Sequence, residues 1–251
     1  MNRIYLGDCL EVMKTIKDKS IDAIITDPPY GTTACKWDSV IPFDLMWEQL
    51  NRIIKPNGAI VLFGSEPFSS ALRMSNIKNY KYDWIWEKSR PSNPMLSKKQ
   101  PLRYVEIISV FYKKQCTYNP QMTDDKKDKR IRVGKSYNVR CGVTEKTKSY
   151  VSNDHRPSRK YPKNIQKFNR NWSPQQQLHP TQKPIALMEY LIKTYTNENE
   201  TVLDFTMGSG TTMVACKKLN RNGIGIEKEK KYYDISVKRL KECQVKSQLF
   251  R

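Results

Sequence analysis

The block Asp27-Pro28-Pro29-Tyr30 places a carboxylate, a carbonyl oxygen and an aromatic ring directly after an apolar run. Proline fixes its own φ angle and restricts the residue before it, so the Asp27 carboxylate and the Pro28 carbonyl are held in fixed directions. An exocyclic amino group on a planar base offers two N–H donors and a π-face, and these acceptors and the Tyr30 ring fit such a substrate. The alternative is a strand-terminating turn with a capping aspartate.

A second constellation is the glycine turn of Gly208 and Gly210, which follows an apolar run at 201–205 and precedes a helical pattern. Glycines at such a turn let a ligand approach the backbone closely. Glu227 ends the next apolar run and is placed to accept hydrogen bonds from ribose hydroxyls. The dinucleotide fingerprint fails, because Met213 occupies its third glycine position. We therefore predict a nucleoside site, with a merely tight strand-to-helix turn as the alternative.

The elements that must position these residues alternate between apolar runs and helical patterns, which is typical of parallel strands joined by helices. The sequence thus predicts an α/β fold with a doubly wound, mostly parallel sheet. A helix is expected over 42–54, followed by a turn at 55–58. The remaining expected strands are 21–26, 59–63, 82–88, 105–113, 201–205 and 224–227, and the remaining expected helices are 9–16, one beginning at Pro184, 210–219 and 230–245.

Basic charge is concentrated in one part of the chain. The net charge is +20, and residues 113–178 hold 17 Lys and Arg against 5 Asp and Glu, which gives this quarter of the chain +12. Aromatic residues are interleaved with the basic ones, and the segment has too few aliphatic residues to build much core. This composition favours a surface that binds phosphates with cations and bases with aromatic rings. The alternative is a solvated or disordered insertion.

Other classes of protein fit the sequence less well. No window holds the 18 or so uncharged apolar residues of a membrane span, and the first residues include Asp and Glu where a signal peptide would be apolar. The 6 cysteines lack C-x-x-C spacing and only 2 histidines accompany them, which disfavours a zinc site or a disulfide framework. We expect a cytoplasmic protein with no metal and no membrane partner.

Three sequence blocks together resemble the amino-methylating DNA methyltransferases that use S-adenosylmethionine. They are the Asp-Pro-Pro-Tyr block at 27–30, the His-Pro-Thr-Gln-Lys-Pro block at 179–184 and the glycine block at 204–210. Their order, with a variable basic region between the first block and the others, resembles the permuted β group of that family. The resemblance implies a Rossmann-like methyltransferase fold and S-adenosyl-L-methionine as the cofactor.

The same resemblance divides the chain into three parts. It implies a catalytic half at 1–112, a basic target-recognition region at 113–178 and a cofactor-binding half at 179–251. Double-stranded DNA is the implied partner of a bacterial, archaeal or phage-encoded enzyme. The resemblance is also compatible with a homodimer and with a cognate restriction endonuclease.

The resemblance assigns individual residues to the site. Asp8 matches the acidic residue that meets the cofactor adenine, although a helix N-cap explains it equally well. Thr181 and Lys183 match positions near the cofactor carboxylate. The implied catalytic residues are Asp27, Pro28, Pro29 and Tyr30, and the implied cofactor-binding residues are Asp8, Asp27, Thr181, Lys183, Asp204, Phe205, Gly208, Gly210, Thr211 and Glu227.

The implied reaction is direct transfer of a methyl group to the amino nitrogen of a base flipped out of the duplex. Aspartate at the first position of the block resembles the adenine-specific members, so N6 of adenine is the predicted acceptor and N4 of cytosine the alternative. Glutamine methyltransferases share an Asn-Pro-Pro-Tyr string, from which Asp27 departs. A non-catalytic DNA-binding module would explain the charge but leave both constellations idle.

Overall fold

The computed structural model describes residues 2–32, 38–124, 133–134, 137–140, 143–146, 150–151, 159–169 and 177–243. The chain forms two compact units, of which the first comprises Met1–Asn119 with Lys163–Arg251 and the second Pro120–Pro162. The described part of the second unit contains three antiparallel strand pairs: β6 (Thr123–Asp124) with β11 (Arg159–Lys160), β7 (Val133–Gly134) with β10 (Tyr150–Val151), and β8 (Tyr137–Arg140) with β9 (Val143–Lys146).

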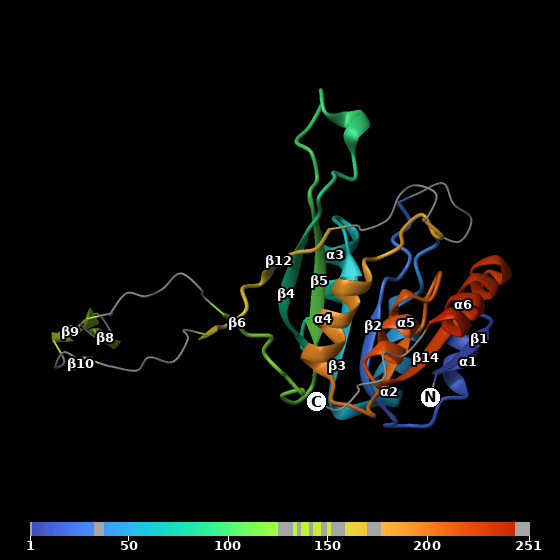
Figure 1. Cartoon of the computed structure of the whole chain (residues 1–251), viewed down its shortest axis with the longest axis horizontal. Helices are drawn as coiled ribbons and strands as arrows, with labels where there is room; N and C mark the ends of the chain where they lie inside the picture. Colours follow the sequence, from blue (N-terminus) through green and yellow to red (C-terminus); the bar gives the residue numbers. More distant parts are fainter. Residues whose placement is uncertain are drawn as a thin grey trace. The chain divides into compact units, whose positions relative to one another are not determined.

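The first unit is built on an eight-stranded sheet with the order β1-β14-β13-β2-β3-β5-β4-β12 (Figure 1). Strand β5 is antiparallel to both of its neighbours, and the other pairs in this sheet are parallel. This confirms the mostly parallel sheet predicted from the sequence. The strands are β1 (Asn2–Leu6), β2 (Ile21–Thr26), β3 (Ile54–Gly64), β4 (Tyr80–Glu87), β5 (Val105–Phe111), β12 (Ile165–Lys167), β13 (Thr201–Asp204) and β14 (Asn222–Glu227).

Helices cover both faces of this sheet, which makes the fold doubly wound (Figure 1). Side chains alternate between the faces along a strand. In β3, Ala59, Val61 and Phe63 therefore pack in one cluster with α4 and α5, whereas Ile60 and Leu62 pack in the other with α1, α2 and α3. The helices are α1 (Cys9–Lys14), α2 (Phe43–Ile53), α3 (Phe68–Ser75), the short 3₁₀ helix η1 (Pro94–Leu96), α4 (Ile185–Tyr195), α5 (Thr211–Lys218) and α6 (Lys230–Glu242).

The turn expected at 55–58 is wrong, because these residues belong to β3. The pairing of β2 with β3 jumps from Ile21 opposite Ile54 to Ala23 opposite Ala59, so the extra residues form an irregularity inside the strand. Sequence periodicity cannot distinguish such an insertion from a loop, because its residues resemble those of a turn.

The compact second unit lies inside the basic region predicted at 113–178, whose role in target recognition stays a prediction. The compact second unit covers Pro120–Pro162, which is narrower than 113–178, and β12 pairs with β4 at the edge of the main sheet. The helix expected at 230–245 ends at Glu242, and its last two residues lie outside the described residues. Among the described helices, none has the length and apolar character needed to cross a bilayer.

The parallel strands bring the predicted site residues to one edge of the sheet. Strand β2 ends just before Asp27, β13 ends at Asp204 and β14 ends at Glu227. The neighbours β2 and β13 connect in opposite directions, toward β3 and toward β14 respectively. Such a switch point at the carboxyl ends of parallel strands leaves a crevice where α/β proteins bind ligands.

The glycine turn before α5 is shaped by close packing as well as by its position. Gly210 has a φ of +76°, and a Cβ atom there would lie 2.7 Å from the Cβ of Ser236 in α6. The turn therefore requires a residue without a side chain at this position whether or not a ligand is bound.

Replacement of Gly210 by alanine is expected to lower the free energy of unfolding by about 2 kcal/mol, because the left-handed backbone and the contact with Ser236 both disfavour a Cβ atom. Urea unfolding measures this loss. The double variant G210A/S236G relieves the contact but not the backbone strain, so it should recover part of the stability. An unchanged unfolding midpoint in G210A would contradict this account.

Candidate functional site

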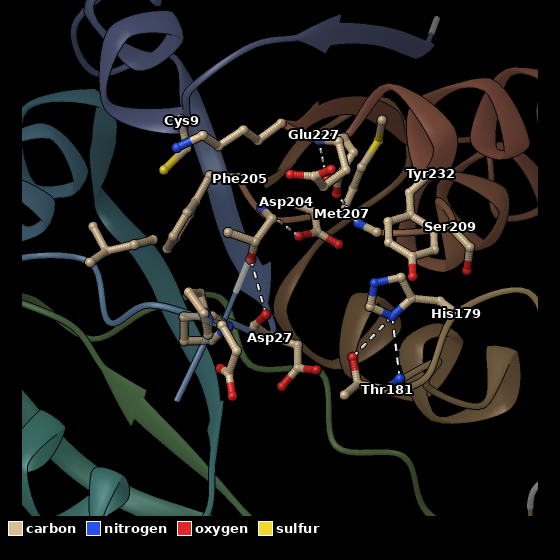
Figure 2. Close-up of a pocket in the computed structure, with 18 of the residues that line it drawn as sticks. Cys9, Asp27, His179, Thr181, Asp204, Phe205, Met207, Ser209, Glu227 and Tyr232 are labelled. Atoms are coloured by element: carbon tan, nitrogen blue, oxygen red, sulfur yellow. Dashed lines mark hydrogen bonds between the residues drawn. The ribbon is translucent and has the colours of Figure 1, made fainter. Parts of the chain in front are cut away.

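A cavity of about 290 Å³ lies at the switch point between β2 and β13. Figure 2 shows Asp27, Asp204, Glu227 and His179 around it. Every residue assigned to the site from the sequence lines this cavity except Gly210. Gly210 instead packs against Ser236, so its part in the turn is conformational.

Asp204 joins the two halves of the site from a buried position. Its carboxylate accepts hydrogen bonds from the Thr26 hydroxyl at 2.6 Å, the Thr212 hydroxyl at 2.5 Å and the Thr206 backbone N–H at 3.2 Å. Burial nevertheless raises the pKa of Asp204 to about 6, because desolvation outweighs these hydrogen bonds. The side chain thus connects the end of β13 to the end of β2 and to the first turn of α5.

Asp27 is held by two side chains that arrive from different directions. The Tyr30 hydroxyl donates to one carboxylate oxygen, and the Lys183 ammonium donates to the other. The Asp27 backbone carbonyl accepts from the Thr206 hydroxyl at 3.0 Å. Burial raises the pKa of Asp27, and the positive charge of Lys183 opposes that rise. The carboxylate is therefore fixed in direction, as the prolines after it also require.

Lys183 belongs to a buried row of alternating charges. Its ammonium lies 3.5 Å from one oxygen of Glu106, and the Lys88 ammonium lies 3.0 Å from the other. Lys183 is 8% exposed and Lys88 2% exposed, so water screens these charges little. The sequence resemblance assigned Lys183 to the cofactor carboxylate, and that role stays a prediction. The contact with Asp27 was not predicted, nor was any role for Glu106 or Lys88.

The chain after Tyr30 is shaped by an aspartate that the sequence analysis missed. The Asp38 carboxylate accepts from the backbone N–H groups of Tyr30, Gly31 and Thr32 at 2.8 to 3.0 Å. The Tyr30 ring lies 5.0 Å from the Phe68 ring, with a tilt of 31°. Asp38 is the one acidic residue between positions 28 and 43, which is the only sequence signal for it.

Glu227 lies at the opposite wall of the cavity from the Asp-Pro-Pro-Tyr block (Figure 2). One carboxylate oxygen accepts from the Gly208 N–H and the other from the Glu229 N–H, each at 2.8 Å. A carboxylate oxygen accepts two hydrogen bonds, so each retains capacity for a ligand hydroxyl. Burial raises the pKa of Glu227. This geometry fits the predicted contact with ribose.

Asp8 satisfies both interpretations that the sequence left open. Its side chain accepts from the Leu10 N–H at 2.9 Å, which makes it the N-cap of α1. It also lines the cavity beside Cys9. The N-cap interpretation is confirmed, and contact with a cofactor adenine stays a prediction.

His179 lines the cavity although the sequence analysis did not assign it to the site. Its Nδ1 accepts from the Thr181 N–H at 3.2 Å, and its ring lies 4.1 Å from the Tyr232 ring at a steep angle (Figure 2). Burial and the charge of Lys183 lower the pKa of His179 to about 4, so the ring is neutral near pH 7. His179 could have been found from its block, whereas Tyr232 lies in an amphipathic helix without a distinguishing signal.

Arg239 of α6 also supports the glycine turn and was missed. Its guanidinium donates to the Ser209 carbonyl at 2.6 Å and to the Thr211 hydroxyl at 3.1 Å. These bonds tie the turn to the last helix. Among the described residues, no group of three or more metal-ligating side chains comes together.

The cavity lies at the switch point of a doubly wound sheet, and Asp27 and Glu227 both line it, which is the architecture of a Rossmann-like methyltransferase fold. Residues 21–238 match the model of the N6_N4_Mtase family, which is described as DNA methylase. The chain belongs to this family of S-adenosylmethionine-dependent DNA amino-methyltransferases, as the three sequence blocks predicted.

Individual relatives agree with this family. The chain is 32% identical to the Type II methyltransferase M.HpaI of Haemophilus parainfluenzae over 95% of this chain and 74% of that protein. It is 30% identical to M1.HpyAVI as seen in the crystal structure of the M1.HpyAVI–SAM complex, with a TM-score of 0.65 over 96% of this chain and 99% of that one. The PvuII DNA methyltransferase (cytosine-N4-specific) shares the fold, with a TM-score of 0.66 at 18% identity over 95% of this chain and 86% of that one.

The raised pKa of Asp204 predicts a pH-dependent stability. The folded state holds this proton up to about pH 6, whereas an aspartate normally loses it near 3.8. The resulting stabilisation, about 3 kcal/mol, is fully present below the lower pKa and is lost as pH rises through the higher one. The free energy of unfolding of the wild type, relative to that of D204N, should therefore decrease as the pH is raised from about 3.8 to about 6.

Urea unfolding at several pH values measures this difference. The variant D44N removes an exposed carboxylate from α2 and serves as the control, for which the difference from the wild type should stay nearly constant. A difference for D204N that does not change with pH would show that Asp204 titrates normally.

Proposed function

We propose that this protein transfers a methyl group from S-adenosylmethionine to N6 of adenine in double-stranded DNA, at specific sites. Membership of the DNA methylase family supports the methyl transfer and the DNA substrate. The observation that carries the proposal is the Asp27 carboxylate, held by Tyr30 and Lys183 in the wall of a cavity that Glu227 lines on the opposite side (Figure 2). The aspartate in the Asp-Pro-Pro-Tyr block supports adenine, through its resemblance to the adenine-specific members.

The residues of the cavity fit the proposed cofactor. Glu227 retains acceptor capacity for ribose hydroxyls, and Asp8 lies near the same wall. Phe205 and Met207 supply apolar surface, while Gly208 keeps the turn free of a side chain beside His179. When bound, S-adenosylmethionine supplies an electrophilic methyl group.

The Asp-Pro-Pro-Tyr block would bind the target base. A base inside the duplex stack cannot reach a buried carboxylate, so the target nucleotide must be extruded. Asp27 and the Pro28 carbonyl then accept the two N–H groups of the exocyclic amine, and the Tyr30 ring supports the base. The carboxylate has acceptor sites left for the amine beside those used by Tyr30 and Lys183. Its negative charge favours electron density on the amino nitrogen, so catalysis is mostly positioning and electrostatics.

We assign recognition of the DNA sequence to residues 113–178, on the basis of their charge of +12 and their aromatic residues. The naming of the relatives as Type II methyltransferases places the family within restriction-modification, which supports the proposal of a cognate restriction endonuclease. We also propose a homodimer, from the family resemblance, and a cytoplasmic location in a bacterium, which the bacterial relatives support.

The direct test is incubation of the purified protein with methyl-labelled S-adenosylmethionine and unmethylated double-stranded DNA, followed by digestion to nucleosides. Label in N6-methyldeoxyadenosine is the expected result. The variant D27N keeps the shape of the side chain but loses its charge, so transfer should fall by at least about a hundredfold while DNA binding is retained. Label in N4-methyldeoxycytidine would reverse the choice of base, and unlabelled DNA with cofactor binding intact would overturn DNA as the substrate.

Lys183 is expected to act as a positioning residue for Asp27. Its charge lowers the pKa of Asp27, so the variant K183M should raise that pKa and move the acid limb of the pH profile of kcat to higher pH. K183R retains the charge and should shift the limb less. K228M removes a lysine that lies by Asp8 instead, and should leave the limb in place. An unshifted limb in K183M would contradict this role.

A further inference from the structure

The loop between β4 and β5 projects beyond the edge of the sheet that holds the cavity (Figure 1). Strand β4 runs parallel to β2 and β5 runs antiparallel, so β4 ends and β5 begins at the edge where Asp27 lies. Residues 89–104 therefore leave and return on the same side of the molecule as the proposed active site. They lie outside 113–178, the region assigned to DNA recognition.

This loop carries a concentrated positive charge. It contains four basic residues and no acidic one, so its 16 residues hold +4 of the +8 that lies outside 113–178. All four basic side chains are exposed. They are Arg90, Lys98, Lys99 and Arg103. Uncompensated exposed cations at this density attract a polyanion.

Apolar side chains are also exposed on the same loop. Met95, in η1, is 93% exposed, and Leu96 and Leu102 are each 38% exposed. Single exposed apolar residues are ordinary on a protein surface. Here they lie between cations on a projecting loop, which is the arrangement that proteins use to place an apolar side chain against base pairs while cations hold the phosphates.

The loop is an ordered structure that is tied to the site. The Asn93 side chain accepts from the Arg103 N–H at 2.7 Å and donates to the Pro101 carbonyl at 3.1 Å, so it connects the two arms of the loop. The Lys88 N–H donates to the Tyr104 carbonyl at 2.7 Å and closes the base. A preorganised loop loses little conformational entropy on binding.

The base of the loop reaches the catalytic carboxylate through side chains. Lys88 follows β4 and Glu106 is the second residue of β5, and their side chains form an ion pair at 3.0 Å. Glu106 in turn lies 3.5 Å from Lys183, which contacts Asp27. A duplex whose extruded base meets Asp27 would therefore lie across the edge from which this loop projects.

We propose that the β4–β5 loop is a second DNA-contact surface, with its four cations on phosphates of the duplex and Met95 against the bases. This inference rests on the proposed function for the identity of the partner. It adds a contact from outside residues 113–178, on the side of the molecule where the methylated nucleotide would lie.

The test measures binding to a labelled DNA duplex of arbitrary sequence over a series of NaCl concentrations, without methyl donor. The variant in which glutamine replaces Arg90, Lys98, Lys99 and Arg103 should bind the duplex at least about tenfold more weakly. The negative slope of log K against log salt should become shallower by about 3 to 4, because each lost phosphate contact removes about 0.9 from its magnitude. The control replaces four exposed lysines near the opposite edge, namely Lys17, Lys19, Lys78 and Lys81, and should change the slope much less.

Met95 is tested separately, because its contact is not electrostatic. M95A should lower affinity for the duplex by about fivefold with an unchanged salt slope. An equal slope change in the loop variant and the control overturns the phosphate contacts, and unchanged affinity in M95A overturns the contact with bases. A greater loss of affinity for single-stranded RNA than for the duplex overturns DNA as the partner. Methyl transfer is assayed independently, so failure of either proposal is distinguishable from failure of the other.

Discussion

The hydrogen bond between the Thr26 hydroxyl and the Asp204 carboxylate joins residues 178 positions apart in sequence at the carboxyl ends of two neighbouring strands. It fixes the end of β2 against the end of β13, and these two strand ends carry the Asp-Pro-Pro-Tyr block and the glycine turn. A second link, from Thr206 to the Asp27 carbonyl, runs beside it. The walls proposed to bind the base and the cofactor therefore share one connection, which sets the distance between Asp27 and the glycine turn.

Keeping several charged groups at this connection requires compensation. Along the row Asp27, Lys183, Glu106 and Lys88 the charges alternate in sign, so each largely buried charge lies beside an opposite one. Unpaired burial of any one of them would cost several kcal/mol. Asp204 lies outside this row, and hydroxyl and N–H donors surround its carboxylate. These donors offset its desolvation only in part, so its pKa stays raised. Two adjacent carboxylates thus have different environments, one suited to a charged acceptor and the other to a structural link.

The sequence predicted the sheet and most of the residues that come together around the cavity, because the relevant signals are local. Apolar runs identify buried strands, and residues such as Asp27 and Glu227 follow directly at strand ends, so parallel pairing alone brings them together. Asp38, Glu106 and Arg239 could not be predicted, because their roles depend on which distant backbone or side chain the fold places beside them. The irregularity inside β3 was mistaken for a turn for a related reason: only strand register reveals it.

The bonds from Arg239 to Ser209 and Thr211 have a consequence for the energetics of local opening. When α6 frays or detaches, the glycine turn loses these restraints, so any ligand that needs the ordered turn also stabilises the docked helix. Occupancy of the cavity should then slow amide hydrogen exchange in α6, although most of that helix does not line the cavity. Protection of α6 from exchange would therefore measure the occupancy of the cavity.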